Sequence, residues 1–318
     1  MATPKKAAPG KYSSKPARLT FATLDTQRGY RLGLKTERGI LDVERASRLF
    51  RIKAPVTIDA VLAGADCAPL KRLVDRALAD KRGKSVLLPE SRVKFGPAVP
   101  HPEKIICVGL NYRGHAMETG NPIPPVPLLF SKYNNALTGH RAKVKLPTRV
   151  SSQFDYEVEL VAVIGRKAVD ISEEGALSCV FGYCNGNDLS ARDLQRATSQ
   201  LMLGKTCDGF APLGPYIVSA DQIPDPQNLK IATYVNGEQR QSSNTKHMIF
   251  DLKTIIESLS LGMTLEPGDV IATGTPSGVG FAMTPPNFLK GGDVIEAEVE
   301  GIGILKNTVR EVPHRVEG

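Results

Sequence analysis

The sequence lacks a hydrophobic run long enough to cross a membrane. No apolar stretch in its 318 residues approaches the roughly 20 residues that a spanning helix needs. The N-terminus also lacks the apolar segment of a secretory signal peptide. Because 41% of the residues are hydrophobic, a large core can still form. We therefore expect a cytoplasmic protein that does not contact membranes.

Cysteine pairs at metal-binding spacing are absent as well. The five cysteines form no C-x-x-C pair, and three of them (Cys107, Cys179 and Cys184) lie in apolar, strand-like surroundings. This pattern predicts reduced thiols in the core of a cytosolic protein, and it argues against disulfides or a zinc site.

Acidic residues are missing from the first eighteen positions, which carry five of the basic residues. The net charge of +8 therefore falls to +3 for the rest of the chain, which mixes both signs and has no basic stripe interleaved with aromatic residues. We expect no nucleic-acid partner. Residues 1–17, rich in Ala, Pro, Ser and Lys, are predicted to be a disordered basic tail.

The length of the chain suggests about two domains. Residues 18–98 alternate short strands with two helical segments and contain no recognisable chemistry, so they predict a small N-terminal α/β cap domain. Residues 99–318 carry every candidate functional motif. We predict that they form the catalytic domain.

An acidic strand at residues 155–165 organises this second region. Its β-branched and aromatic residues predict one continuous strand, with Asp155, Glu157 and Glu159 on one face. Carboxylates about 6.6 Å apart on so apolar a strand repel each other, and oxygen ligands suit Mg²⁺ or Mn²⁺. Asp188, at the end of a later strand, supplies a possible third ligand. The alternative is an edge strand whose acidic face meets water.

A polar turn after the strand at residues 104–110 contains His115 and Glu118, three positions apart. That spacing places both on one side of a helical turn, and a carboxylate beside an imidazole gives a general base. The alternative is a surface histidine with a chance acidic neighbour.

Further polar groups follow other predicted strands. Lys132 ends one strand, and a helix is expected from residue 189 with Ser190 as its cap and with Arg192 and Gln195 on one side. Lys205 follows a glycine, but Ser199 stands where a nucleotide-binding P-loop needs another glycine, so Lys205 is interpreted as a cation beside an acidic site. In the glycine-rich loop at residues 274–280, backbone N–H groups and Thr275 can hold a substrate carboxylate.

Taken in this order, the motifs resemble the fumarylacetoacetate hydrolase family. They lie between residues 103 and 310 and comprise the Gly-x-Asn-Tyr turn with His115 and Glu118, Lys132, the Asp-Tyr-Glu-x-Glu strand, Asn187-Asp188 with Ala191-Arg192-Asp193-x-Gln195, Gly204-Lys205, and the loop from Gly274 to Gly280. The resemblance implies an α+β, β-rich fold, a mixed β-sandwich roll with flanking helices, and a homodimer. It also implies one Mg²⁺ or Mn²⁺ per subunit held by Glu157, Glu159 and Asp188. The N-terminal region is similar to the cap of bacterial members.

The resemblance further implies a 2-oxo or 2,4-dioxo acid as substrate. His115 and Glu118 would activate water, Lys205 would act in catalysis, and substrate would contact Lys132, Arg192, Gln195, Gly274 and Thr275. Our first interpretation is a metal-dependent hydrolase of acylpyruvates that releases pyruvate and a carboxylic acid. The alternative is a decarboxylase or tautomerase of 2-oxo acids such as oxaloacetate or 2-hydroxyhepta-2,4-diene-1,7-dioate. A non-catalytic metal-binding protein is a third interpretation.

Overall fold

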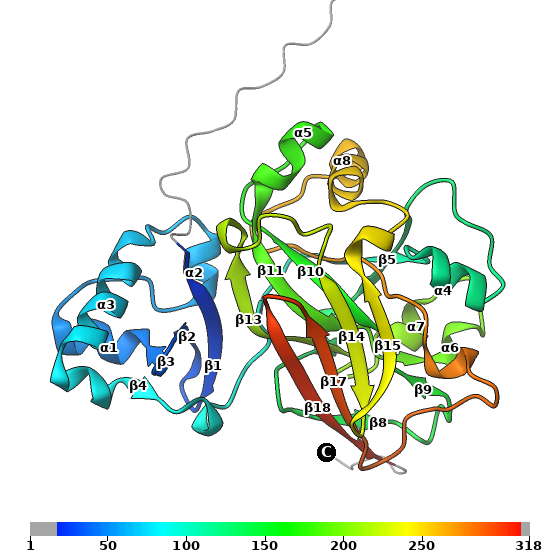
Figure 1. Cartoon of the computed structure of the whole chain (residues 1–318), viewed down its shortest axis with the longest axis horizontal. Helices are drawn as coiled ribbons and strands as arrows, with labels where there is room; N and C mark the ends of the chain where they lie inside the picture. The colour runs from blue at the N-terminus through cyan, green and yellow to red at the C-terminus, as the bar shows by residue number, and fades with distance from the viewer. Residues whose placement is uncertain (1–17, 313–318) are drawn as a thin grey trace, which may run out of the picture.

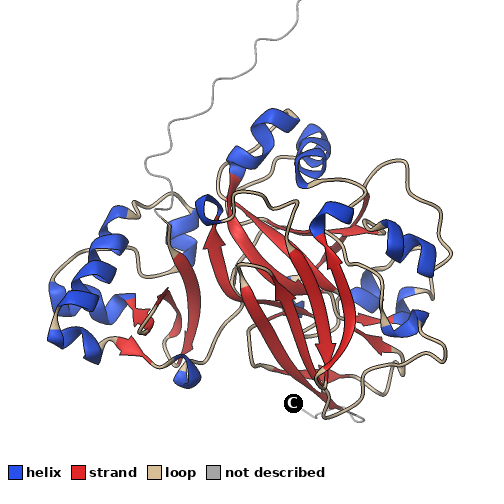
Figure 2. Ribbon diagram, in the orientation of Figure 1, coloured by secondary structure: helices blue, strands red, loops and turns tan. Residues whose placement is uncertain are grey.

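The computed structural model describes residues 18–312, and the basic tail predicted at residues 1–17 lies outside this range. Strands occupy the centre of the molecule and helices lie at its periphery (Figure 2). The β-rich α+β class predicted from the sequence is confirmed. None of the helices in residues 18–312 has the length and apolarity to cross a bilayer.

A large mixed sheet runs through the whole molecule. Its strand order is β4-β3-β2-β1-β13-β11-β10-β16-β5-β6, and β7 pairs with β13. Most neighbours are antiparallel, but β5 and β16 run parallel. The strands are β1 (Thr20–Thr26), β2 (Gly29–Thr36), β3 (Gly39–Asp42), β4 (Leu87–Leu88), β5 (Ile105–Gly109), β6 (Leu128–Lys132), β7 (Leu137–Thr138), β10 (Val158–Ile164), β11 (Val180–Asn187), β13 (Ala211–Ser219) and β16 (Val270–Ala272).

A second sheet of five strands packs against the first and makes the predicted sandwich. Apolar side chains of both sheets share one core cluster, including Val158 and Leu160 from the large sheet and Ala297 and Val299 from the small one. The order is β15-β14-β17-β18-β8. The strands are β8 (Lys143–Leu146), β14 (Lys230–Val235), β15 (Glu238–Asn244), β17 (Val294–Val299) and β18 (Gly303–Glu311).

Eight short to medium helices flank these sheets in the described residues. Two of them begin at aspartate caps: Asp42 accepts a hydrogen bond from Arg45 N, and Asp251 accepts one from Thr254 N. The helices are α1 (Val43–Phe50), α2 (Ile58–Leu62), α3 (Ala68–Ala79), α4 (Arg113–Glu118), α5 (Glu173–Ala176), α6 (Arg192–Gln195), α7 (Met202–Lys205) and α8 (Leu252–Gly262).

The N-terminal strands extend the large sheet across the predicted cap boundary. Strands β1 to β4 and helices α1 to α3 form the blue and cyan unit in Figure 1. Strand β1 pairs with β13 of the main body, with Phe21 opposite Ile217. A separate cap domain at residues 18–98 stays a prediction.

Three local predictions are wrong. The acidic strand is not continuous, because β9 (Phe154–Asp155) belongs to a two-stranded sheet with β12 (Ser190–Ala191), and β10 begins only at Val158. It is also no edge strand, since β10 lies between β11 and β16. Ser190 caps no helix: α6 begins at Arg192, and the Ser190 hydroxyl donates to the carbonyl of Asp188.

Candidate metal centre and active site

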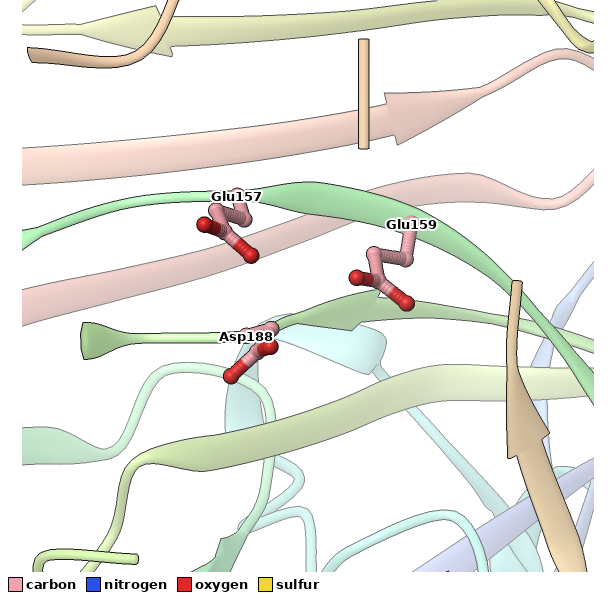
Figure 3. Close-up of side chains that lie close together, drawn as sticks. All are labelled: Glu157, Glu159 and Asp188. Atoms are coloured by element: carbon pink, nitrogen blue, oxygen red, sulfur yellow. The ribbon is translucent and has the colours of Figure 1, made fainter. Parts of the chain in front are cut away.

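Three buried carboxylates converge where β10 and β11 meet. One ligand oxygen each from Glu157, Glu159 and Asp188 lies within 4.8 Å of the others (Figure 3). The antiparallel register, with Val158 opposite Asn187, brings the end of β11 beside the start of β10. Asp188 N donates to the carbonyl of Glu157 at 2.8 Å, which fixes the two ligand-bearing segments against each other.

The break before β10 is made by side chains that take the place of strand partners. Three consecutive backbone N–H groups donate to side-chain oxygens: Tyr156 to Asp155, Glu157 to Asn187 and Val158 to Gln241, at 2.9, 3.0 and 3.1 Å. Buried N–H groups need such partners once they leave a ladder. Asp155 therefore does not lie with Glu157 and Glu159, although the sequence predicted all three on one face of a strand.

Buried cations surround two of the three carboxylates. Lys205 Nζ lies 2.8 Å from Glu157 and 2.7 Å from Asp188, Lys132 Nζ lies 2.6 Å from Asp188, and Arg192 lies 2.6 Å from Glu157. Burial alone would raise the pKa of Glu157, but Lys205, Arg192 and His115 hold that pKa well below its usual range. Glu157 is therefore ionised.

Glu159 differs from its neighbours. It accepts a hydrogen bond from Gly274 N at 3.0 Å, and it makes no ion pair with a basic residue in the range 18–312. Burial raises its pKa well above the usual value, and the charges of Asp188 and Glu157 raise it further. Without a cation such a buried carboxyl group stays protonated, and a bound cation would allow it to ionise. Three carboxylate oxygens that converge in this way fit a hard divalent ion such as Mg²⁺ or Mn²⁺.

The predicted pair of His115 and Glu118 is present on α4. His115 Nδ1 lies 2.7 Å from one oxygen of Glu118, and Gly278 N donates to the other at 2.8 Å. We assign the Nδ1 proton to His115, because a carboxylate that also accepts a backbone N–H is an acceptor here. His115 is 6% exposed, so the alternative of a surface histidine is wrong.

The loop that follows β16 is attached to this site at several points. Besides the bonds of Gly274 to Glu159 and Gly278 to Glu118, Gly280 N and Phe281 N donate to Asp155 at 2.8 and 3.1 Å. The ring of Phe281 also lies 4.5 Å from the guanidinium of Arg192. The loop therefore contacts a candidate metal ligand, the His–Glu pair and the basic side of the site.

The remaining predicted residues are all near these groups, with differing access. Lys132 is 4% exposed, and its amine also donates to the carbonyls of Leu189, Lys205 and Phe210. Arg192 donates to Gln195 at 3.0 Å, as their spacing predicted. Thr275 is buried and accepts a hydrogen bond from Gln241. Their roles toward substrate stay predictions.

Sequence reasoning missed three supporting residues: Asn187 and Gln241, which fix the backbone of the ligand strand, and Asp155 in its actual role. Gln241 lies in the polar strand β15, which carries no apolar alternation. Of these residues, Asn187 could have been found from the sequence, because it immediately precedes the candidate ligand Asp188.

The chain is similar to known proteins in sequence. The family model described as fumarylacetoacetate (FAA) hydrolase C-terminal matches residues 104–310. The oxaloacetate tautomerase YisK of Bacillus subtilis (strain 168) is 44% identical over 279 residues, which cover 85% of this chain and 92% of that protein.

Solved structures with the same fold are also similar to this chain in sequence. A putative HpcE protein from Mycobacterium smegmatis has a TM-score of 0.77 and 35% identity, covering 92% of this chain and 99% of that one. A fumarylacetoacetate hydrolase from Exiguobacterium antarcticum has a TM-score of 0.74 and 35% identity, covering 92% and 100%. The chain belongs to the fumarylacetoacetate hydrolase family.

Proposed function

We propose that the protein is a divalent-metal-dependent tautomerase that interconverts the keto and enol forms of a 2-oxo dicarboxylic acid of the oxaloacetate type. The observation that carries this proposal is a single oriented base, His115, beside a buried carboxylate triad. The similarity to an oxaloacetate tautomerase supports it. It replaces acylpyruvate hydrolysis, which the sequence ranked first.

The ion would be one Mg²⁺ or Mn²⁺ per chain, held by Glu157, Glu159 and Asp188. When bound, it supplies a Lewis acid that stabilises negative charge on the oxygen atoms of a 2-oxo acid. The homodimer implied by the family resemblance stays a prediction.

His115 would move the proton. With Nδ1 held by Glu118, Nε2 is left for substrate. In the keto-to-enol direction the C3–H bond breaks, its proton goes to Nε2, and its electron pair forms the C2–C3 double bond. The π electron pair of the C2 carbonyl moves onto its oxygen. The oxygen on C2 then takes the proton back from the imidazolium. The reverse sequence gives the keto form, so one base suffices and no water enters the reaction.

The second candidate is hydrolysis of an acylpyruvate. The same His–Glu pair can deprotonate water, and one structural neighbour is a fumarylacetoacetate hydrolase. The two candidates differ in product. Hydrolysis releases pyruvate, whereas tautomerisation releases nothing and changes only the amount of enol, which is measured by its ultraviolet absorbance.

The test compares these products for the wild type, His115→Gln and Glu118→Gln, with Mn²⁺ and after chelation. We expect fast keto–enol exchange of oxaloacetate in the wild type, little pyruvate from acylpyruvates, and loss of exchange after chelation. Each substitution should lower the exchange rate by about 10²- to 10⁴-fold, the usual effect of losing a general base. Both variants should keep their Mn²⁺ affinity.

His101→Gln is the matched control, since His101 also pairs with a carboxylate, that of Asp59 at 3.2 Å, but at an exposed position. It should exchange at the wild-type rate. Rapid pyruvate release without enzyme-catalysed exchange would reject the tautomerase and favour the hydrolase. An unchanged exchange rate in His115→Gln would remove the base assignment.

A further inference from the structure

Gln241 is a fully buried amide on β15 whose hydrogen-bonding capacity is completely used. Its Oε1 accepts from Val158 N at 3.1 Å and from the Thr233 hydroxyl at 2.7 Å. Its Nε2 donates to the Thr275 hydroxyl and to the carbonyl of Pro276, both at 2.8 Å. An amide side chain has two acceptor and two donor positions, so none is left over.

The neighbours of this amide also fix its orientation. The Val158 N–H can only donate and the Pro276 carbonyl can only accept, so the oxygen must face β10 and the nitrogen must face the loop. Thr233 stands directly opposite Gln241 in the β14–β15 pair and holds the oxygen from the other side.

Each end of the amide serves a different part of the active site. Val158 lies between the two glutamates of the carboxylate triad, at the position where the backbone rejoins the large sheet. Thr275 and Pro276 directly follow Gly274, whose N–H binds Glu159. Two residues further on, Gly278 N binds the Glu118 carboxylate of the His–Glu pair.

We propose that Gln241 is a positioning residue that couples the metal-ligand strand to the loop at residues 274–281. Its oxygen sets the backbone from which Glu157 and Glu159 project, and its nitrogen sets the distance of the loop from that backbone. The proposal rests on the function proposed above in that it places metal and substrate at this site. The four hydrogen bonds of the Gln241 amide all go to protein atoms, so Gln241 acts on the metal and the substrate only through the ligand strand and the loop.

The principal test is Gln241→Met, which keeps the length of the side chain and removes all four hydrogen bonds. Loss of a residue that orients metal ligands typically costs 10- to 100-fold in metal affinity or activity. We expect titration calorimetry to show Mn²⁺ affinity about tenfold weaker or worse. Hydrogen exchange of the loop amides, including Gly274 and Gly278, should be faster than in the wild type. The KM for substrate should rise as well.

Gln239→Met is the matched control on the same strand, because Gln239 is exposed and its amide donates to the Tyr234 hydroxyl. It should leave all three measurements unchanged. Thr233→Val keeps Gln241 but removes the hydroxyl that orients it, so the changes should have the same direction and smaller size. If Gln241→Met does not fold, this variant carries the test.

A purely structural role predicts a different result. In that case Gln241→Met would lower the melting temperature, while Mn²⁺ affinity and loop exchange, measured well below that temperature, would match the wild type. This result would overturn the proposal. If the wild type lacks tautomerase activity but Gln241→Met still weakens Mn²⁺ binding and loosens the loop, the proposed function fails and the positioning role stands.

Discussion

A buried ammonium group holds two of the three carboxylates together. Lys205 is 2% exposed and lies between Glu157 and Asp188. Burial alone would lower the pKa of Lys205, but Asp188 and Glu157 raise it above the usual value, so the amine is charged. Breaking a buried pair is costly because the remaining charges lose their partner. We therefore expect Lys205 to affect both stability and catalysis through the same contacts.

Lys205→Met should separate these two effects. Without metal, the free energy of unfolding should fall by about 3–5 kcal/mol, since two buried carboxylates lose a shared cation. Saturating Mn²⁺ should narrow this deficit, because an ion that binds only the folded protein neutralises the same carboxylates. Turnover should remain low even with Mn²⁺, since the group that steadies developing negative charge is missing. Denaturant unfolding with and without Mn²⁺ measures the first effect.

The control is Lys306→Met, which removes a cation paired with Glu296 on the surface. An exposed pair is worth at most about 1 kcal/mol, so stability and turnover should both stay close to wild type. Wild-type turnover in Lys205→Met would show that Lys205 serves only to balance charge.

At the scale of elements, the loop at 274–281 can pack closely against β15 because residue 278 is a glycine. Gly278 has φ +106°, and a Cβ at this position would lie 2.0 Å from the carbonyl oxygen of Arg240. Its N–H binds Glu118 and its carbonyl accepts from the Tyr156 hydroxyl at 3.0 Å. Any side chain must therefore push the loop away from β15 and from the His–Glu pair.

Gly278→Ala should lower kcat/KM strongly, by about 10²-fold, because displacements of about 1 Å at a reacting centre have effects of this size. The matched control is Gly292→Ala: its φ of +98° is similar, but a Cβ there would meet no atom within 4 Å. The control should lose only the roughly 1–2 kcal/mol of stability that left-handed backbone costs an L-residue, with unchanged kcat/KM. Equal kcat/KM in the two variants would mean that close approach at Gly278 is irrelevant to the reaction.

The sequence predicts most strands but misses what shapes the site. Runs such as residues 158–164, and the alternation in 294–299, identify β10 and β17 directly. The break before β10 could not be found, because its causes are side chains of Asn187 and Gln241, which lie 30 and 83 positions away. The prediction of a helix from residue 189 is wrong for a related reason. Residues 190–191 form β12, which pairs with β9, so α6 begins only at Arg192. The three carboxylates that lie together were named from local patterns, Glu157 and Glu159 from the acidic strand and Asp188 from the end of another strand, and their role as metal ligands stays a prediction.

At the scale of the whole molecule, the N-terminal region and the main body share one hydrophobic cluster. Phe21 on β1 is 1% exposed, and its ring centroid lies 5.1 Å from that of Phe181 on β11. The same cluster contains Leu70 of α3 and Val161 of β10. Since Val161 lies two residues after Glu159 on β10, the core of the N-terminal region is continuous with the core beneath the candidate metal centre.

This continuity predicts that the described chain unfolds in one transition. Phe21→Ala should lower the free energy of unfolding by about 3–5 kcal/mol, and Leu70→Ala, far from the junction, by about 2–5 kcal/mol. Both should shift the same calorimetric peak, and loss of Mn²⁺ binding should follow that peak, because Val161 of β10 packs in the same cluster as Phe21 and Leu70. An independent cap would behave otherwise: Leu70→Ala would move an early transition alone and leave Mn²⁺ binding intact above it. The two substitutions together therefore decide whether the regions before and after residue 98 unfold separately or as one unit.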